Sequence, residues 1–276
     1  MMGNHIPLDS FIGTVLARGE EQYRDFAWRR TADPYAILVS EIMLQQTQTT
    51  RVERYFDEWM RRFPTVADLA DASTGEALAA WAGLGYNRRA LALKRAAEQV
   101  CAEFGGVLPA TEAELLSLPG VGPATAAALL AFAYNKPAVY LETNVRSVLL
   151  HEFFPETDGV TDTKLRSLLT EINECVRARG IDARDWNYAL LDYGAYLKKA
   201  CPNPSRRSKH HSRQSPYEGS RRQKRARLLE AVLEIPGQTT EMLARSLGYA
   251  PALTESILFD LAAEGFLRRE SDRWSV

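Results

Sequence analysis

Residues 118–125 read LPGVGPAT and join two segments in which apolar residues recur with helical spacing. Gly120 and Gly122 allow positive φ angles and a close approach of the backbone to a ligand. Pro123 suits the first turn of a helix, and the unsatisfied amides of that turn favour an anion. The stretch therefore predicts two helices joined by a hairpin that binds a phosphate group, with an ordinary interhelical turn as the alternative.

The sequence on both sides of this hairpin is typical of helices. Over residues 9–198 apolar residues recur every three or four positions, as at Leu129 and Phe132. Thr111, followed three residues later by Glu114, predicts a capping box at one helix start. Glycine and proline punctuate the boundaries between these segments. The pattern indicates an all-α protein over most of its length.

The composition excludes several classes of protein. The 276 residues are 46% hydrophobic and include no run of about 18 apolar residues, so we expect a globular protein with no membrane partner. The three cysteines are far apart and lack metal-ligand or redox spacing. The first residues also lack the pattern of a secretory signal. These features together indicate a reducing, cytoplasmic location.

Charge is distributed unevenly along the chain. The net charge is only −1, yet residues 198–227 contain eleven Lys or Arg and a single acid, Glu218. A basic segment in an otherwise acidic chain predicts a phosphate-binding strip that includes Arg206, Arg207 and Lys209. A solvated linker is the alternative interpretation.

The C-terminal part of the chain changes character. Residues 199–222 are rich in proline, serine and basic residues, which predicts a linker or extended loop. Residues 223–276 contain three helical segments, the third starting at Thr254, and two short strands around the Ser271-Asp272 turn, which predicts a winged helix. We therefore divide the chain into a helical domain at 1–198, a basic linker and a winged-helix-like domain. The last domain is expected to contact DNA, with a dimerisation or packing module as the alternative.

Four motifs occur in the order and at the spacing of one known family. They are PY at 34–35 with SEIMLQQTQ at 40–48, GLGY at 83–86, LPGVG at 118–122 and LETNVRSV at 141–148. Over roughly residues 25–200 the chain resembles the helix-hairpin-helix (HhH-GPD) superfamily of DNA glycosylases, and within it the MutY-type adenine DNA glycosylases. The resemblance implies an all-α, two-lobed fold with the active site in the cleft between the lobes.

Cleavage of an N-glycosidic bond suits a pair of carboxyl groups. Positive charge develops on the sugar and negative charge on the leaving base, so one acid protonates the base and one carboxylate stabilises the sugar. Glu41 has apolar neighbours in sequence, and an apolar setting raises the pKa of a carboxyl group. The resemblance assigns the acid role to Glu41 and the second role to Glu142, where the family has Asp. It places Asn144 beside that second carboxylate.

The resemblance also assigns contacts with the bases of DNA. Gln45 and Gln46 match residues that contact or wedge against the opposite base. Tyr86 matches a tyrosine near the lesion. A purely structural role remains the alternative for these three residues and for Asn144, and a solvated helix face is the alternative for a lone glutamate such as Glu41.

Two further implications of the resemblance concern the hairpin. Gly120, Val121 and Gly122 match the phosphate-binding turn, where the backbone carbonyls of Leu118 and Val121 would hold a sodium or potassium ion. Ala124 occupies the position at which endonuclease III relatives carry a Schiff-base lysine. Without that amine we expect base removal only and no lyase activity at the abasic site.

Two features of the family are missing from this sequence. Most relatives hold an iron–sulfur cluster through four spaced cysteines. Counting from Cys201, the corresponding positions are Ser208, His211 and Tyr217, so we expect no cluster and no other cofactor. Because residues 223–276 have the pattern of a winged helix, we also expect no Nudix-like domain, which in MutY enzymes recognises 8-oxoguanine.

The sequence thus predicts a monofunctional DNA glycosylase of base excision repair that flips a base out of the duplex and hydrolyses its glycosidic bond. Adenine opposite 8-oxoguanine or guanine is the first expected substrate. A thymine or uracil mismatch glycosylase is the alternative within enzymes, and a non-catalytic lesion-binding protein is the alternative outside them. The expected partner is double-stranded DNA with a mispaired or damaged base, bound by a monomer.

Overall fold

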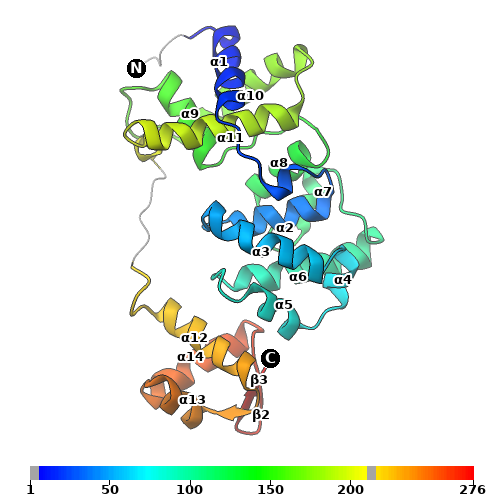
Figure 1. Ribbon diagram of the computed structural model, residues 1–276, viewed down its shortest axis with the longest axis vertical. Helices are drawn as coiled ribbons and strands as arrows, with labels where there is room; N and C mark the ends of the chain where they lie inside the picture. Colours follow the sequence, from blue (N-terminus) through cyan, green and yellow to red (C-terminus); the bar gives the residue numbers. More distant parts are fainter. Residues whose placement is uncertain (1–5, 210–215) are drawn as a thin grey trace. The chain divides into compact units, whose positions relative to one another are not determined.

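The computed structural model describes residues 6–209 and 216–276 (Figure 1). Helices form most of the chain, and one small sheet lies near the C-terminus, so the predicted fold class is confirmed. The chain divides into two compact units. Unit 1 comprises residues 1–45 and 108–213, and unit 2 comprises residues 46–107 and 214–276. None of the helices in the described ranges is both long and apolar enough to cross a membrane.

Unit 1 is entirely helical apart from its loops. Its elements are α1 (Leu8–Glu21), the 3₁₀ helix η1 (Ala27–Arg29), α2 (Pro34–Leu44), α7 (Glu112–Ser117), α8 (Pro123–Phe132), α9 (Thr143–Phe153), α10 (Asp162–Ala178), α11 (Ala183–Ala200) and the 3₁₀ helix η2 (Pro204–Arg207). Helix α8 is the core of this unit, because all of its residues from 125 to 132 are buried. It contacts α2, α7 and α11.

A buried ion-pair network ties the N-terminal segment of unit 1 to α11. The Asp192 carboxylate accepts hydrogen bonds from Arg24 at 2.6 Å and from both terminal nitrogens of Arg29 at 2.7 and 2.9 Å. The side chains of Arg29 and Asp192 are almost fully buried. The Arg29 guanidinium also lies 4.4 Å from the centre of the Tyr188 ring. Loss of one partner would leave a buried charge uncompensated, which makes this network structurally important.

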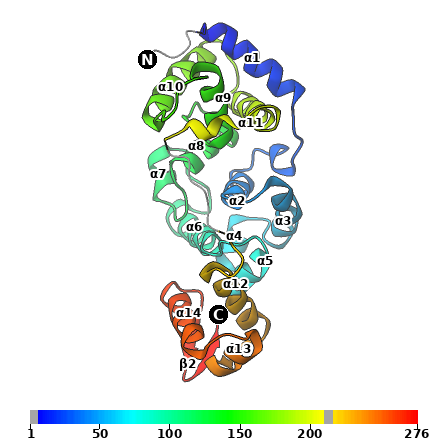
Figure 2. The same cartoon turned by 90° about the vertical axis from the view of Figure 1, so that its left-hand side faces the viewer.

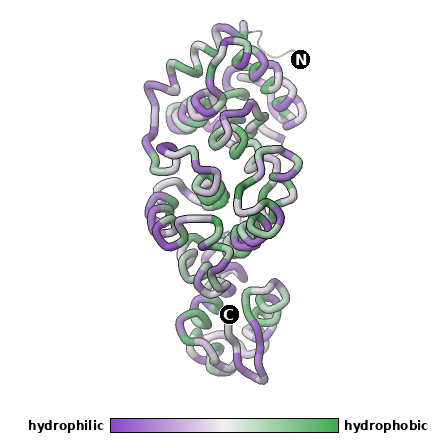
Figure 3. The backbone as a smooth tube through the Cα atoms, turned by 90° about the vertical axis from the view of Figure 1, so that its right-hand side faces the viewer, coloured by the Kyte–Doolittle hydropathy of each residue, from purple (hydrophilic) through white to green (hydrophobic). Residues whose placement is uncertain are grey.

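Unit 2 begins with four helices. They are α3 (Thr49–Arg62), α4 (Val66–Asp71), α5 (Thr74–Trp81) and α6 (Arg88–Phe104). In α3 the buried residues Val52, Phe56 and Trp59 recur at four- and three-residue spacing. Along the backbone as a whole, hydrophobic and hydrophilic residues alternate over short stretches (Figure 3). The Trp59 ring packs edge-on against Trp81 at 5.4 Å between ring centroids.

The C-terminal region of unit 2 has the predicted winged-helix pattern. It contains α12 (Arg221–Glu234), β1 (Gln238–Thr239), α13 (Thr240–Leu247), α14 (Pro251–Ala263), β2 (Arg268–Glu270) and β3 (Arg273–Ser275) (Figure 2). The strands form an antiparallel sheet in the order β1-β3-β2, so the predicted hairpin gains a third strand. Trp274 is fully buried, and its indole nitrogen donates a hydrogen bond to the Thr240 hydroxyl at 3.0 Å.

The basic segment after α11 packs against the rest of unit 1. Helix η2 contacts α9, and Ser208 forms an isolated parallel bridge with Val160. The Arg207 guanidinium donates a hydrogen bond to the Leu150 carbonyl at 2.9 Å. Arg206 and Lys209 are exposed. The described part of this segment is therefore an ordered loop that leaves two of its three predicted DNA-binding cations on the surface.

Candidate active site

Glu41 lies on a helix whose other residues are nearly all buried. Helix α2 begins at Pro34, and the Asp33 carboxylate caps it by accepting the amides of Tyr35 and Ala36. Burial and the nearby charge of Glu142 raise the pKa of Glu41 to about 8, while a hydrogen bond from Tyr140 partly offsets the rise. The Glu41 carboxyl group therefore keeps its proton at neutral pH, which agrees with the effect expected from its apolar neighbours.

Tyr140 is a site residue that the sequence motifs did not reveal. Its hydroxyl donates a hydrogen bond to Oε2 of Glu41 at 3.3 Å, and its ring packs edge-on against Phe132 at 5.4 Å. Burial, with the neighbouring carboxylates, raises the pKa of Tyr140, so the phenol stays a donor. Its position two residues before Glu142 is the one sequence signal that could have identified it.

Glu142 caps the N-terminus of α9. Oε1 of its carboxylate accepts the amide of Asn144 at 2.5 Å and the amide of Val145 at 3.0 Å. No hydrogen bond to its Oε2 is found among the described residues. Glutamate is uncommon as a helix cap, where shorter polar residues predominate. Its longer side chain lets one oxygen cap the helix while the other is left for a ligand.

The two carboxyl groups differ in how strongly their charged forms are stabilised. Burial raises the pKa of Glu142, but the amides at the start of α9 oppose that rise. The positive charges of Lys198 and Arg146 oppose it as well. Glu41 has one such compensating contact, the Tyr140 hydroxyl. Glu142 is therefore the group that ionises first, and Glu41 is the group that retains the proton.

Close packing of α11 against α9 holds the Glu142 cap in place. A side-chain carbon on Gly194 would overlap the backbone of Asn144, so only glycine permits this approach. Lys198 lies one turn after Gly194 on α11, and therefore on the same face. Burial lowers the pKa of Lys198, and the charge of Glu142 partly restores it. Asn144 has a buried side-chain oxygen without a partner among the described residues.

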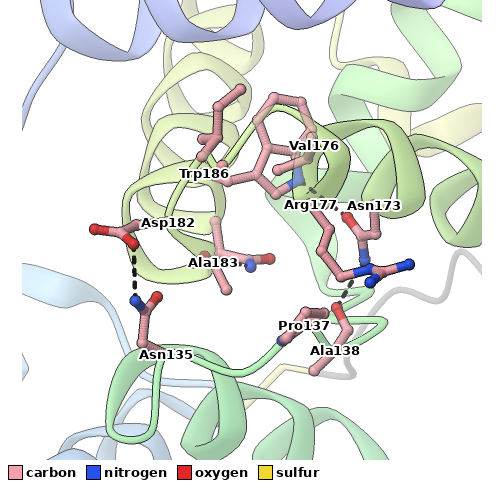
Figure 4. Close-up of a pocket in the computed structure, with 12 residues that line it drawn as sticks. Asn135, Pro137, Ala138, Asn173, Val176, Arg177, Asp182, Ala183 and Trp186 are labelled. Atoms are coloured by element: carbon pink, nitrogen blue, oxygen red, sulfur yellow. Dashed lines mark hydrogen bonds between the residues drawn. The ribbon is translucent and has the colours of Figure 1, made fainter.

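The loop that leads to Tyr140 and Glu142 is anchored beside a small pocket (Figure 4). The Asn173 amide donates a hydrogen bond to the Ala138 carbonyl at 2.9 Å, and Asn135 donates one to Asp182 at 2.9 Å. The pocket has a volume of about 270 Å³ and is lined by these four residues among others, but by neither catalytic candidate. Its walls therefore position the loop, and the carboxyl groups of Glu41 and Glu142 lie outside it.

The hairpin has the conformation expected for close approach of a ligand. Gly120 has a φ of 79°, which a residue with a side chain rarely adopts. Gly122 has a φ of −94° and does not use the positive φ that glycine allows, and a side-chain carbon there would meet open space. The Val121 amide donates to the Leu118 carbonyl at 3.1 Å, which leaves one lone pair of that oxygen available. Pro123 begins α8 as predicted.

Gln45 connects the end of α2 to the helix after the hairpin. Its side-chain nitrogen donates a hydrogen bond to the Thr125 hydroxyl at 3.3 Å and lies 3.5 Å from the Gly120 carbonyl. Thr125 is buried in α8. The predicted base-contacting residue Gln45 thus lies beside the hairpin backbone and within unit 1.

Two predicted base-contacting residues of unit 2 have strained backbones. Gln46 and Tyr86 have positive φ angles of 56° and 51°, which are uncommon for residues other than glycine. Tyr86 is 40% exposed, and the guanidinium of Arg89 lies 5.5 Å from its ring centre. Arg89 holds the loop by donating hydrogen bonds to the Gly85 carbonyl and the Thr47 hydroxyl, both at 3.0 Å. Strain of this kind is concentrated at functional sites in proteins.

The residues present do not fit a four-cysteine iron–sulfur cluster. The chain has three cysteines, and Cys101 on α6, Cys175 on α10 and Cys201 lie in different elements. Cys201 donates its thiol to the Leu197 carbonyl. The described residues contain no group of three His, Cys, Asp or Glu that could hold a metal ion. His210 and His211 lie outside the described residues.

Comparison with known proteins identifies relatives that act on DNA bases. The model of the HhH-GPD superfamily base excision DNA repair protein matches residues 39–174. The adenine DNA glycosylase of Mycolicibacterium smegmatis is 31% identical over 269 residues, which cover 90% of this chain and 89% of that protein. The human adenine DNA glycosylase is 41% identical over 149 residues, which cover 51% of this chain but only 27% of the human protein. The structure of a thermostable thymine-DNA glycosylase aligns with a TM-score of 0.62 and 29% identity, over 73% of this chain and 90% of that one.

Proposed function

This chain belongs to the HhH-GPD superfamily of base excision DNA repair proteins, and we propose that it is a monofunctional DNA glycosylase that removes adenine mispaired with 8-oxoguanine or guanine. The observation that carries the proposal is the unequal pair of carboxyl groups, with a protonated Glu41 and a helix-capping Glu142. Pairs whose environments separate their protonation states are typical of acid–base catalysis.

The two carboxyl groups divide the reaction between them. Glu41 donates its proton to a ring nitrogen of the flipped base, so the electron pair of the C1′–N bond leaves with a neutral base. The Glu142 carboxylate stabilises the positive charge that develops on the sugar. A water molecule then adds to C1′ and passes a proton to the Glu41 carboxylate, which regains the proton that it gave to the base. The products are a free base and an abasic site in an otherwise intact strand.

Neighbouring side chains keep these two roles separate. The Tyr140 hydroxyl orients the Glu41 carboxyl group through its hydrogen bond to Oε2. The α9 amides hold Oε1 of Glu142, and the close approach of Gly194 fixes the start of α9. Asn144 lies two residues after the cap, and its side-chain oxygen, which has no partner among the described residues, is a candidate to orient the attacking water.

The hairpin and the basic loop would bind the DNA backbone. The amides at the start of α8, with Gly120, Val121 and Gly122, suit a phosphate group. The carbonyls of Leu118 and Val121 would hold a sodium or potassium ion, whose positive charge would add to the attraction for that phosphate. Arg206 and Lys209 offer exposed charges, whereas Arg207 is already engaged with the Leu150 carbonyl.

We expect no lyase step at the abasic site. That step needs an amine that forms an imine with C1′, and Ala124 supplies none at the start of α8. Lys198 is another amine to consider, because burial lowers its pKa and the charge of Glu142 partly restores it. Borohydride trapping on an abasic duplex tests for such an imine. Wild type should give no covalent complex. A complex that forms with wild type and disappears in Lys198→Ala would identify Lys198 as the nucleophile.

A thymine or uracil mismatch glycosylase is the second candidate function. The 29% identity to a thymine-DNA glycosylase of known structure favours it, because that alignment covers 90% of the other chain. The same two carboxyl groups would serve this reaction. We expect either enzyme to act as a monomer on duplex DNA inside the cell.

A single-turnover assay on labelled duplexes tests the proposal. The panel contains A:8-oxoguanine, A:G, T:G, U:G and an undamaged duplex, each analysed with and without alkali. Strand breaks that appear only after alkali, and from the adenine mispairs, are the expected result. Breaks from T:G or U:G would establish the second candidate. Glu41→Gln should abolish release, and full activity of that variant would refute the catalytic assignment.

A further inference from the structure

The C-terminal region reaches the exposed tyrosine of the GLGY motif. Arg222 lies in the first turn of α12, and its guanidinium donates a hydrogen bond to the Tyr86 hydroxyl at 3.0 Å. The same guanidinium lies 6.0 Å from the centre of the Tyr86 ring. These residues are 136 positions apart in sequence, and both belong to unit 2. A residue of the winged helix therefore contacts a residue assigned to base recognition.

Tyr86 lies between two arginines. Arg89 approaches the ring to 5.5 Å, and Arg222 approaches it to 6.0 Å and binds its hydroxyl. Cation–π contacts at exposed rings are individually weak, but two of them restrict the orientation of one ring. The left-handed backbone at Tyr86 is maintained only where surrounding contacts hold it. Arg222 supplies one of those contacts from outside the loop.

An ion-pair cluster next to Tyr86 sets the position of Arg222. The Glu264 carboxylate, just after α14, accepts hydrogen bonds from Arg88 of α6 at 2.7 and 2.8 Å. It also accepts one from Arg225 of α12 at 2.7 Å. The Arg88 and Arg225 charges hold the pKa of Glu264 below its usual range. The start of α12 is thus tied to the start of α6, two residues after Tyr86.

We propose that Arg222 is a positioning residue for Tyr86, through which the C-terminal winged helix contributes to lesion recognition in duplex DNA. The proposal rests on the glycosylase function inferred above. Held between Arg89 and Arg222, the Tyr86 ring presents one exposed edge to the bases. Stacking of an aromatic ring on a base is sequence-tolerant, so its orientation determines how well a disturbed base pair is distinguished from an intact one.

The neighbouring Arg221 provides a matched control for Arg222. Its guanidinium donates hydrogen bonds to Asp260 at 2.6 Å and to Ser256 at 3.1 Å, both on α14. Arg221 therefore holds the winged helix together, whereas Arg222 reaches the GLGY loop. Replacing either residue by alanine removes the same charge from the same turn of α12. A difference between the two variants then reports the contact and not the charge.

The experiment measures binding, so it does not depend on base release. Duplexes carry 2-aminopurine beside a stable abasic-site analogue, or beside an intact pair, and the full-length protein is titrated at several salt concentrations. The 2-aminopurine fluorescence reports stacking near the lesion. The affinity for the lesion duplex divided by the affinity for the intact duplex is the discrimination ratio. Arg222→Ala should lower that ratio about tenfold, while Arg221→Ala should change it less than about twofold but lower thermal stability.

Two further variants separate positioning from charge. Arg222→Lys keeps the positive charge but not the planar guanidinium. The salt dependence of DNA binding should therefore equal that of wild type, whereas the discrimination ratio should stay as low as in Arg222→Ala. Tyr86→Phe removes the acceptor of the hydrogen bond, so Arg222→Ala should cost less in that background. Equal loss of discrimination in Arg221→Ala and Arg222→Ala, or full rescue by lysine, would overturn the proposal. Wild-type protein that discriminates lesions but releases no base would instead refute the proposed function and leave this inference intact.

Discussion

Glu41→Gln is expected to make the protein more stable as well as inactive. Burial and the charge of Glu142 raise the pKa of Glu41 from its ordinary 4.5 to about 8. The unfolded chain loses this proton near pH 4.5 and the folded chain near pH 8. Between these values unfolding releases a proton, so rising pH favours the unfolded state. The stability contributed by the protonated group is complete below pH 4.5 and is lost as the pH rises through 8.

The size of the effect follows from the pKa difference. At about 1.36 kcal/mol per pKa unit, a rise from 4.5 to about 8 corresponds to about 5 kcal/mol over the whole range. The interval from pH 5 to pH 8 covers only part of this range, and Glu41 is half ionised in the folded chain at pH 8, so we expect about 3 kcal/mol across this interval. Glutamine does not titrate, so the stability advantage of Glu41→Gln should grow by that amount across this interval.

Urea denaturation followed by circular dichroism at pH 5, 6.5 and 8 measures this difference. Glu53→Gln serves as the control, because Glu53 is exposed on α3 and its replacement should change stability by less than about 0.5 kcal/mol. A gap between wild type and Glu41→Gln that widens with pH supports a buried, protonated acid. Parallel curves for the two proteins would refute the reasoning, since Glu41 would then titrate alike in both states. Gain of stability on removal of a catalytic group is a recognised trade-off in enzymes.

Three other variants probe the candidate active site and the basic loop. Tyr140→Phe removes the hydrogen bond that lowers the pKa of Glu41, so the basic limb of the single-turnover rate should move to higher pH by up to about one unit, and an unmoved limb would contradict the contact. Gly194→Ala should slow base release at least about tenfold and cost about 1–3 kcal/mol of stability by displacing Asn144, whereas Gly13→Ala, which meets open space in α1, should do neither. Arg206→Ala combined with Lys209→Ala should reduce the slope of log affinity against log salt by up to about 0.9 for each phosphate that the loop no longer neutralises, and an unchanged slope would exclude binding of the DNA backbone by this loop.

Local rules predicted much of the fold. Pro123 at the start of α8 and the left-handed Gly120 follow from the known preferences of these residues. The start predicted at Thr254 for the third helix of the C-terminal region is wrong. The helix begins at Pro251, so Thr254 is buried in its interior, and the Thr254 hydroxyl donates to the carbonyl of Ala250, the residue before the helix. Threonine is thus ambiguous between a cap and a helix interior, whereas proline in the first turn is the stronger signal.

The residues that prepare the candidate site depend on contacts distant in sequence. Tyr140 acts on Glu41 across 99 positions, and Gly194 approaches Asn144 from another helix. Neither contact leaves a periodic or spaced pattern that a single sequence could reveal. The short strand β1 escapes sequence-based prediction for a similar reason, because its two residues are recognised only by their pairing with Arg273 and Trp274.

The replacement of the family aspartate by Glu142 has a physical rationale in the α9 cap. Capping requires a carboxylate oxygen near the amides of Asn144 and Val145, and both amides bind Oε1. An aspartate at this position would bring its carboxylate nearer the helix by one methylene. With glutamate, the amides that bind Oε1 still stabilise the carboxylate, and the longer side chain lets Oε2 extend farther from the α9 backbone. The longer side chain therefore does not argue against catalysis, because the amides of the helix that holds the carboxylate oppose the rise in its pKa caused by burial.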